Sequence, residues 1–287
     1  MPSAIGFILS KVPAHFSRSS IRREEFLELQ KAMEAGNPED LSTPFERYVE
    51  TRWLARYNVM IIIHKNWDTL KWYFELIIPN LSLGQKFEVK ALLDMMKDES
   101  NHLLMAFLIP IVGEFEKLNA MFQATGSADA ENAYDALEKC VRSLRKRVMI
   151  PGTQAYLPVQ EADLGVSFKT MATGFIHSHI NREESEKIVN DLKRRCFGFL
   201  TNLLTETDKR LPPNIDVFRK IKLFSPSSLF KNSPPQFADL PFTKDMELEE
   251  QGEIEQQYRL VLDENWSENS PFKELEVRYK EVKKYLP

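Results

Sequence analysis

Glycine and cysteine are scarce in this sequence. Only 10 of the 287 residues are glycine, well below the usual fraction of about 7%. Barrels, sandwiches and phosphate-cradling α/β folds rely on glycine at their tight turns, so none of these folds is expected. The two cysteines, Cys140 and Cys196, are too few for a disulfide scaffold or a structural zinc site.

Long apolar runs are absent as well. The longest run covers residues 103–112, whereas a bilayer-spanning helix needs about 20 apolar residues. We therefore interpret this run as part of a buried helix. The N-terminal residues lack the basic segment and the apolar length of a secretory signal. These observations predict an intracellular, reduced protein with no membrane partner.

Charge is unevenly distributed along the chain. The formal net charge is -4 and the pI is about 5.9, values that mark no global basic surface. Residues 239–287 carry a net charge of -6, however, while residues 1–238 carry +2. A slightly basic body is thus joined to an acidic tail, which keeps contacts with nucleic acid open.

Apolar residues recur at helical spacing through most of the body. A mainly α fold with several helices and little or no sheet is therefore expected. The clearest pattern ends at Pro79, and a second pattern, over residues 104–122, contains Pro110, which should kink or split that helix. The first pattern consists of Trp53, Tyr57, Met60, His64, Trp67, Leu70, Phe74 and Ile77.

Four further helices are expected, at residues 21–35, 137–148, 188–203 and 272–286. Residues 152–179 show only a weak alternation, which fits either a short strand or an irregular connection. Six prolines lie between residues 211 and 241 and should prevent helix formation there. The predicted domains are an N-terminal polar or linker segment (1–50), a helical domain (51–210), a proline-rich linker (211–241) and an acidic helical tail (242–287).

Basic residues cluster on two of the expected helices. Arg142 and Lys146 are four residues apart and share a helix face, which suits contacts with successive phosphates. A solvated helix face is the other interpretation, and the cluster by itself favours it. The first cluster consists of Lys139, Arg142, Arg145, Lys146 and Arg147, and the second of Lys193, Arg194 and Arg195.

No catalytic motif is recognisable. The sequence contains no Gly-x-Ser-x-Gly elbow, no Cys/His signature and no glycine-rich phosphate loop. His177 and His179 are spaced as metal ligands but have no third ligand nearby, so a surface or turn role is favoured. No cofactor or small-molecule substrate is expected, and a divalent metal only with a catalytic site that the sequence does not reveal.

Residues 51–56 read Thr-Arg-Trp-Leu-Ala-Arg and precede the aromatic helix. Arg52 offers a guanidinium for a phosphate, and Trp53 offers a ring for stacking on a base. Alternatively, Trp53 covers the core at the helix start while Arg52 pairs with Glu50 or with solvent. The physical argument by itself favours this second interpretation.

The same segment resembles the TRWLSR-like motif of hAT-superfamily transposases and of host proteins derived from them. Further segments are similar to family motifs and follow in the family's order, so that the resemblance covers roughly residues 12–230. They are the Ser/Arg-rich stretch 16–30, Phe-Glu-Lys-Leu-Asn at 115–119, Cys-Phe-Gly-Phe-Leu at 196–200, Lys-Arg-Leu-Pro at 209–212 and Phe-Ser-Pro at 224–226.

This resemblance implies an RNase H-like catalytic domain that is interrupted by a large helical insertion domain. It implies that Trp53 stacks on a flipped base or a DNA hairpin and that Arg52 contacts a phosphate, which would offset the cost of base extrusion. Nuclear localisation and binding to hairpin or distorted DNA ends follow from it. Arg56 and the basic residues Arg142, Arg145, Lys146 and Arg147 complete the predicted DNA-binding set.

The sequence also departs from the family. The first two catalytic aspartates of the family lie in strands ahead of the TRW motif, where this sequence has only Asp40. The motif that carries the third acid is not recognisable. We therefore expect a catalytically incomplete, transposase-derived protein with DNA-binding or protein-interaction properties. The alternatives are a protein–protein scaffold without a nucleic-acid role and an active, metal-dependent transposase.

Overall fold

The structure is a computed structural model that describes residues 3–17, 19–33, 53–123, 129–210, 223, 234–240, 243 and 247–263. These residues are mainly helical, which confirms the prediction of a mainly α fold. Over this part of the chain, extended pairing is limited to one antiparallel bridge between Met149 and Tyr156. No helix among the same residues has the length and apolar character needed to cross a membrane.

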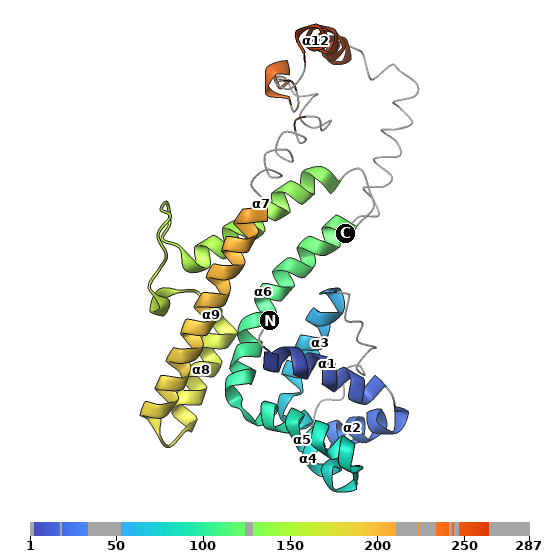
Figure 1. Cartoon of the computed structure of the whole chain (residues 1–287), viewed down its shortest axis with the longest axis vertical. Helices are drawn as coiled ribbons and strands as arrows, with labels where there is room; N and C mark the ends of the chain where they lie inside the picture. The colour runs from blue at the N-terminus through green and yellow to red at the C-terminus, as the bar shows by residue number, and fades with distance from the viewer. Residues whose placement is uncertain are drawn as a thin grey trace. The chain divides into compact units, whose positions relative to one another are not determined.

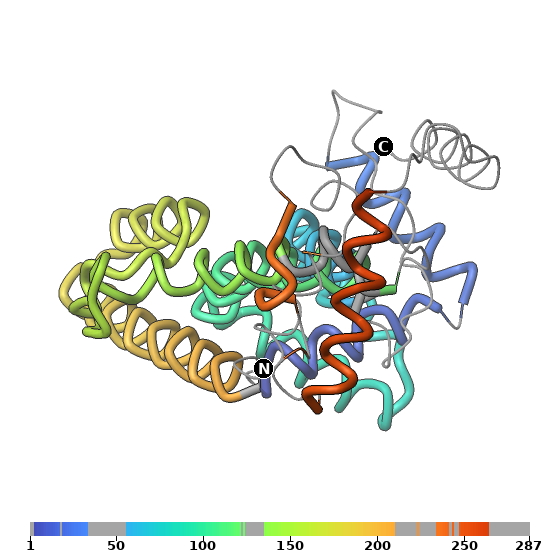
Figure 2. The backbone as a smooth tube through the Cα atoms, turned by 90° about the horizontal axis from the view of Figure 1, so that it is seen from above, coloured from blue at the N-terminus to red at the C-terminus, as the bar shows by residue number. Residues whose placement is uncertain are grey.

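Helices follow one another along the described chain (Figure 1). In order, they are α1 (Ser3–Ser17), α2 (Ser20–Met33), α3 (Trp53–Lys65), α4 (Trp67–Ile77), the 3-10 turn η2 (Ile78–Asn80), α5 (Leu83–Lys97), α6 (Glu99–Gln123), α7 (Asp129–Val148), the 3-10 turn η3 (Val159–Glu161), α8 (Val166–Ser178), α9 (Arg182–Arg210), the 3-10 turn η5 (Phe237–Asp239) and α12 (Leu248–Asp263). At 29 residues, α9 is the longest of these helices (gold in Figure 2).

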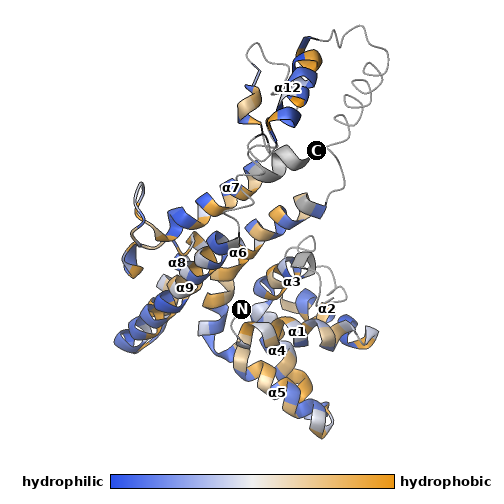
Figure 3. Cartoon of the chain, turned by 45° about the horizontal axis from the view of Figure 1, so that its top comes forward, coloured by the Kyte–Doolittle hydropathy of each residue, from blue (hydrophilic) through white to orange (hydrophobic). Residues whose placement is uncertain are grey.

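Contacts divide the chain into two compact units. The first comprises Met1–Asp129 and Asp135–Lys209, and the second comprises Ala130–Tyr134 and Arg210–Pro287. The first unit is built around α6, which contacts α1, α3, α5 and α8. The α6 side chains from Leu103 to Leu108 are all buried, so this helix supplies the centre of the core, and hydrophobic colour predominates along its middle in Figure 3.

The predicted N-terminal linker, residues 1–50, instead contributes two helices to the first unit. α1 contacts α3, α5 and α6 and buries five large apolar side chains at helical spacing: Ile5, Ile8, Leu9, Val12 and Phe16. The helical spacing of these apolar residues explains their burial. The polar helix expected at 21–35 corresponds to α2.

The aromatic pattern after residue 50 forms two helices where the periodicity predicted one. The chain breaks at Asn66, whose side-chain amide donates to the Ile62 carbonyl oxygen and accepts from Gln30. The break is local, because the Asn66 backbone amide still donates to the Ile62 carbonyl oxygen and the Asn66 carbonyl oxygen accepts from the Leu70 amide. Trp67 and Phe74 lie in the core as expected from the pattern, whereas Trp72 is exposed.

Pro110 does not split its helix, because α6 continues from Glu99 through Pro110 to Gln123. Proline removes one backbone donor, but the buried side chains on both sides of it, such as Leu108 and Ile111, hold the helix in the core.

Residues 152–179 also differ from expectation, because they contain the helix α8 and neither a strand nor a wholly irregular connection. Phe168, Ala172 and Phe175 are its buried residues. Their gaps of four and three are helical, whereas Val166, half of the predicted alternation, is exposed. The helix expected at 188–203 is part of α9. Its buried residues include Val189, Leu192 and Cys196, whereas Ile188 is exposed.

In the second unit, α12 lies within the predicted acidic tail. The Tyr258 hydroxyl donates to the Pro235 carbonyl oxygen at 2.7 Å, and the Tyr258 ring lies 6.0 Å from that of Phe237. The predicted helix at 272–286 and most of the predicted linker at 211–241 lie outside the described residues.

Candidate functional site

The basic face of α7 is the candidate site that the structure describes most fully. Leu137, Val141, Leu144 and Val148 are buried, with helical gaps of four, three and four. They form the predicted apolar face of this helix. Lys139, Arg142, Arg145 and Lys146 are exposed and, from their spacing, share one side of the helix. We call these four residues the α7 stripe.

Arg147 does not belong to this stripe, although the sequence placed it in the same cluster. Its guanidinium pairs with Glu114 on α6 at 2.8 Å, and the two side chains are only 12% and 30% exposed. The Arg147 carbonyl oxygen also accepts from the Asp163 amide at 2.9 Å. Breaking a buried pair leaves an unpaired charge away from water, which is strongly destabilising. Arg147 therefore links α7 to α6 and is not available to a ligand.

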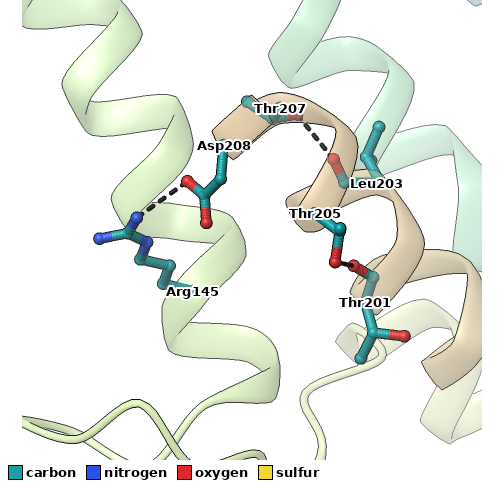
Figure 4. Close-up of polar contacts among 6 residues, drawn as sticks. All are labelled: Arg145, Thr201, Leu203, Thr205, Thr207 and Asp208. Carbon is teal, nitrogen blue, oxygen red and sulfur yellow. Dashed lines mark hydrogen bonds and ion pairs between the residues drawn. The ribbon is translucent and has the colours of Figure 1, made fainter. Parts of the chain in front are cut away.

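Arg145 is paired as well, but near the surface. Its Nη2 atom lies 2.8 Å from Oδ1 of Asp208 on α9, and the two side chains are 54% and 40% exposed. Figure 4 shows the two side chains reaching toward each other from separate helices. Exposed pairs contribute about 0–1 kcal/mol to stability. This contact therefore costs little to exchange for another anion.

The other members of the stripe are less constrained. Arg142 pairs with Glu138 one turn away on the same helix at 3.0 Å, with both side chains at least 40% exposed. Lys139 and Lys146 have no ion-pair partner in the part of the chain that the structure describes. The α7 stripe thus combines two cations without a carboxylate partner and two that are paired at the surface.

α9 carries the second predicted basic cluster. Arg194 pairs with Asp191 at 3.3 Å on the same helix, Arg195 is exposed, and Lys193 is partly exposed. Hydrophilic colour predominates along α9 in Figure 3. Its own acids neutralise part of its charge. The five cations of α7 between residues 139 and 147, by contrast, have no acid between them in the sequence.

The structure describes only part of the TRW segment. Thr51 and Arg52 lie outside the described residues, and Trp53 begins α3 without a described side chain. Arg56 lies in the first turn of α3 and is partly buried. The stacking role of Trp53 and the phosphate contact of Arg52 therefore stay predictions.

Among the described residues, the two thiols and the paired histidines show no arrangement for catalysis. Burial raises the pKa of Cys140 to about 11 and that of Cys196 to about 12, so both thiols stay protonated and are poor nucleophiles. His179 uses Nδ1 to bond the Phe175 carbonyl oxygen at 2.8 Å, at the C-terminal end of α8. Within the described segments, no three His, Cys, Asp or Glu side chains converge as a metal site would require.

Sequence reasoning missed Glu114 and Asp208, the two carboxylates that divide the basic cluster. They lie 33 and 63 residues from their arginine partners, so no local spacing reveals them. The Glu138–Arg142 pair could have been found, because acid and base are four residues apart on one helix.

Comparison with known proteins identifies no relative of this chain, because no protein-family model, no curated protein and no solved structure matches it.

Proposed function

We propose that this chain is a catalytically incomplete, hAT transposase-like protein that binds DNA through the phosphate backbone. The observation that carries the proposal is the α7 stripe, in which Lys139, Arg142, Arg145 and Lys146 are exposed on one side of one helix. The motif order of the sequence supports the family assignment, and the mainly helical first unit is compatible with an insertion domain.

The physical basis of binding is the release of counterions. Each phosphate that a Lys or Arg neutralises releases a cation from the DNA, so the logarithm of the binding constant falls with the logarithm of salt concentration by about 0.9 per contact. The stripe extends from Lys139 to Lys146, which at 1.5 Å per residue spans roughly 10 Å of helix. That length suits contacts with two or three neighbouring phosphates.

The test is a salt series of binding to hairpin-ended DNA. The test variant carries Lys139→Gln, Arg142→Gln and Lys146→Gln, and we expect its salt slope to be shallower by about two to three units. Its matched control carries Lys31→Gln, Lys90→Gln and Lys169→Gln, which remove three exposed lysines from α2, α5 and α8. The control loses the same net charge and should keep more of the slope.

Trp53→Ala tests the stacking role separately. Loss of one stacked base costs about 1–3 kcal/mol, so this variant should bind hairpin ends on the order of tenfold more weakly while binding to plain duplex changes little. Wild-type protein that shows no salt-dependent binding would contradict the proposal. If the stripe variant and its control lost equal amounts of the salt slope, the α7 stripe would not be the DNA-binding surface.

A second function, as a protein–protein scaffold, is favoured by the exposed apolar residues of α4 and α5. Trp72, Leu76, Leu83 and Phe87 are all exposed, and exposed apolar groups often mark interaction surfaces. A nuclease-treated pull-down that retains partners with the stripe variant, but loses them with Leu83→Ser and Phe87→Ser, would support this function over DNA binding.

A further inference from the structure

Asp208 lies near the C-terminus of α9, a position that does not favour an acidic residue. It is the third residue from the end of α9 (Arg182–Arg210), and the partial negative charge at a helix C-terminus repels an anion. Aspartate is also a weaker helix former than most residues. The stability of α9 therefore gives no reason for this carboxylate.

Hydrogen bonds within α9 leave Asp208 free to face α7. The neighbouring hydroxyls point back into the helix, since Thr205 donates to the Thr201 carbonyl oxygen at 2.8 Å and Thr207 to that of Leu203 at 2.7 Å. The carboxylate instead reaches Arg145 (Figure 4). Among the described residues, the ion-pair partner of Asp208 is thus Arg145, a cation of the α7 stripe.

The geometry at Arg145 is the geometry of a phosphate contact. A guanidinium Nη2 atom lies 2.8 Å from a carboxylate oxygen, within the range of charge-assisted hydrogen bonds to carboxylates and phosphates alike. The pair is about half exposed, so an incoming phosphate oxygen can reach the guanidinium without opening the core. By contrast, the Arg147–Glu114 pair is largely buried, so replacing Glu114 by a phosphate at Arg147 would cost much more free energy.

We propose that Asp208 is a built-in competitor for DNA phosphate at Arg145 and thereby limits the affinity of the α7 stripe. The inference rests on the proposed function and names a regulatory contact of the same site. In the free protein, the Asp208 carboxylate pairs with the Arg145 guanidinium. When DNA binds, a phosphate takes its place, and Asp208 is left to solvent and to salt cations.

This exchange makes a specific prediction for salt dependence. The DNA releases a counterion at Arg145, but salt also weakens the Arg145–Asp208 pair that the phosphate must displace, so part of the salt dependence of this contact is offset in the wild-type protein. If Asp208 is neutral, this offset is lost. The slope should then steepen, by at most about 0.9.

The experiment measures DNA binding over a salt series for Asp208→Asn, Arg145→Gln and the double variant. Asp208→Asn should bind DNA up to about fivefold more tightly at low salt, which is the upper range for an exposed ion pair, with a steeper slope. In the Arg145→Gln background, the same substitution should have little effect. Circular dichroism and thermal unfolding check that each variant is folded.

Glu206→Gln is the matched control, because Glu206 lies on the same helix two residues earlier and pairs with Lys209 at 2.9 Å. It removes the same charge without freeing Arg145. An equal gain from Glu206→Gln, or a gain from Asp208→Asn that persists without Arg145, would overturn the inference and leave the proposed function standing. If no protein in the series, Asp208→Asn included, binds DNA in a salt-dependent way, both fail.

Discussion

Two arginine–carboxylate pairs near the end of α7 differ in their exposure to solvent. On the inward side, Arg147 and Glu114 form a pair that is largely removed from solvent. On the outward side, Arg145 and Asp208 have the same 2.8 Å separation but are about half exposed. Distance is equal in the two pairs, so burial alone separates a contact that stabilises the fold from one that is free to exchange.

The inward side is crowded elsewhere along α6 as well. A Cβ atom on Gly113 would lie 2.7 Å from Cε2 of Tyr57 on α3, closer than real side chains approach. The His102 ring stacks on Trp67 with centroids 4.5 Å apart. These contacts predict that substitutions on the inward side change stability, whereas those on the α7 stripe change binding.

The largest expected effect is that of Arg147→Gln. The substitution leaves the partly buried Glu114 carboxylate without its cation, and we expect a loss of about 2–3 kcal/mol in unfolding free energy, somewhat below the 3–5 kcal/mol of a fully buried pair. Urea denaturation followed by circular dichroism measures it. Joint replacement of Arg147 and Glu114 by Met should recover much of the loss, and a loss below 0.5 kcal/mol in the single variant would contradict this interpretation.

Gly113→Ala should have the next largest effect. Overpacking costs about 1–3 kcal/mol, partly offset by the better helix propensity of alanine, so a net destabilisation of about 1–2 kcal/mol is expected. Adding Tyr57→Leu should remove the clash and reduce that cost in a double-mutant cycle.

Gly198→Ala is the control for this prediction. A Cβ atom on Gly198 in α9 would have no atom within 4 Å, so the substitution should be neutral or stabilising by roughly 0.5–1 kcal/mol. Equal effects at the two glycines would show that the contact with Tyr57 does not matter.

Acidification should also weaken the inward side. Burial, followed by the neighbouring His64, lowers the pKa of His102 to about 4. The folded state then binds fewer protons than the unfolded state, so this contribution to stability is complete above pH 6.5 and is lost as the pH falls toward 4. Between pH 8 and pH 5, the loss should be on the order of 1–2 kcal/mol.

His102→Phe tests this assignment, because it keeps a ring against Trp67 but removes the titrating group. Its stability should decline less than that of the wild type between pH 8 and pH 5 in urea denaturation. At pH 8, where the histidine is neutral in both states, the variant reports the packing change alone. Identical pH profiles would rule out His102 as a source of the acid sensitivity.

The smallest expected effect is that of Arg145→Gln on stability. Because the Arg145–Asp208 pair is exposed, the unfolding free energy should change by less than about 0.5 kcal/mol. Measured beside Arg147→Gln under the same conditions, this variant gives the difference in unfolding free energy between the exposed and the buried pair. A loss as large as that of Arg147→Gln would mean that burial does not distinguish the two pairs.

The sequence predicted several of the helices because apolar spacing records which face of a helix is buried. That reasoning located the helical pattern of residues 137–148 and the polar helix α2. It did not predict α1 or α5, and it missed α8, where a weak alternation hid Phe168, Ala172 and Phe175 at helical intervals. It also missed the break at Asn66, because Gln30, its partner, lies 36 residues away.

For the candidate site, too, local spacing and tertiary contacts gave different information. The sequence shows that five cations gather on one helix between residues 139 and 147 and that the opposite face of this helix is apolar. Which of these cations can meet a ligand depends on the folded structure, because Glu114 and Asp208 come from other helices. Local spacing sets which residues share a face, but the cost of moving a charge depends on the atoms that folding brings around it.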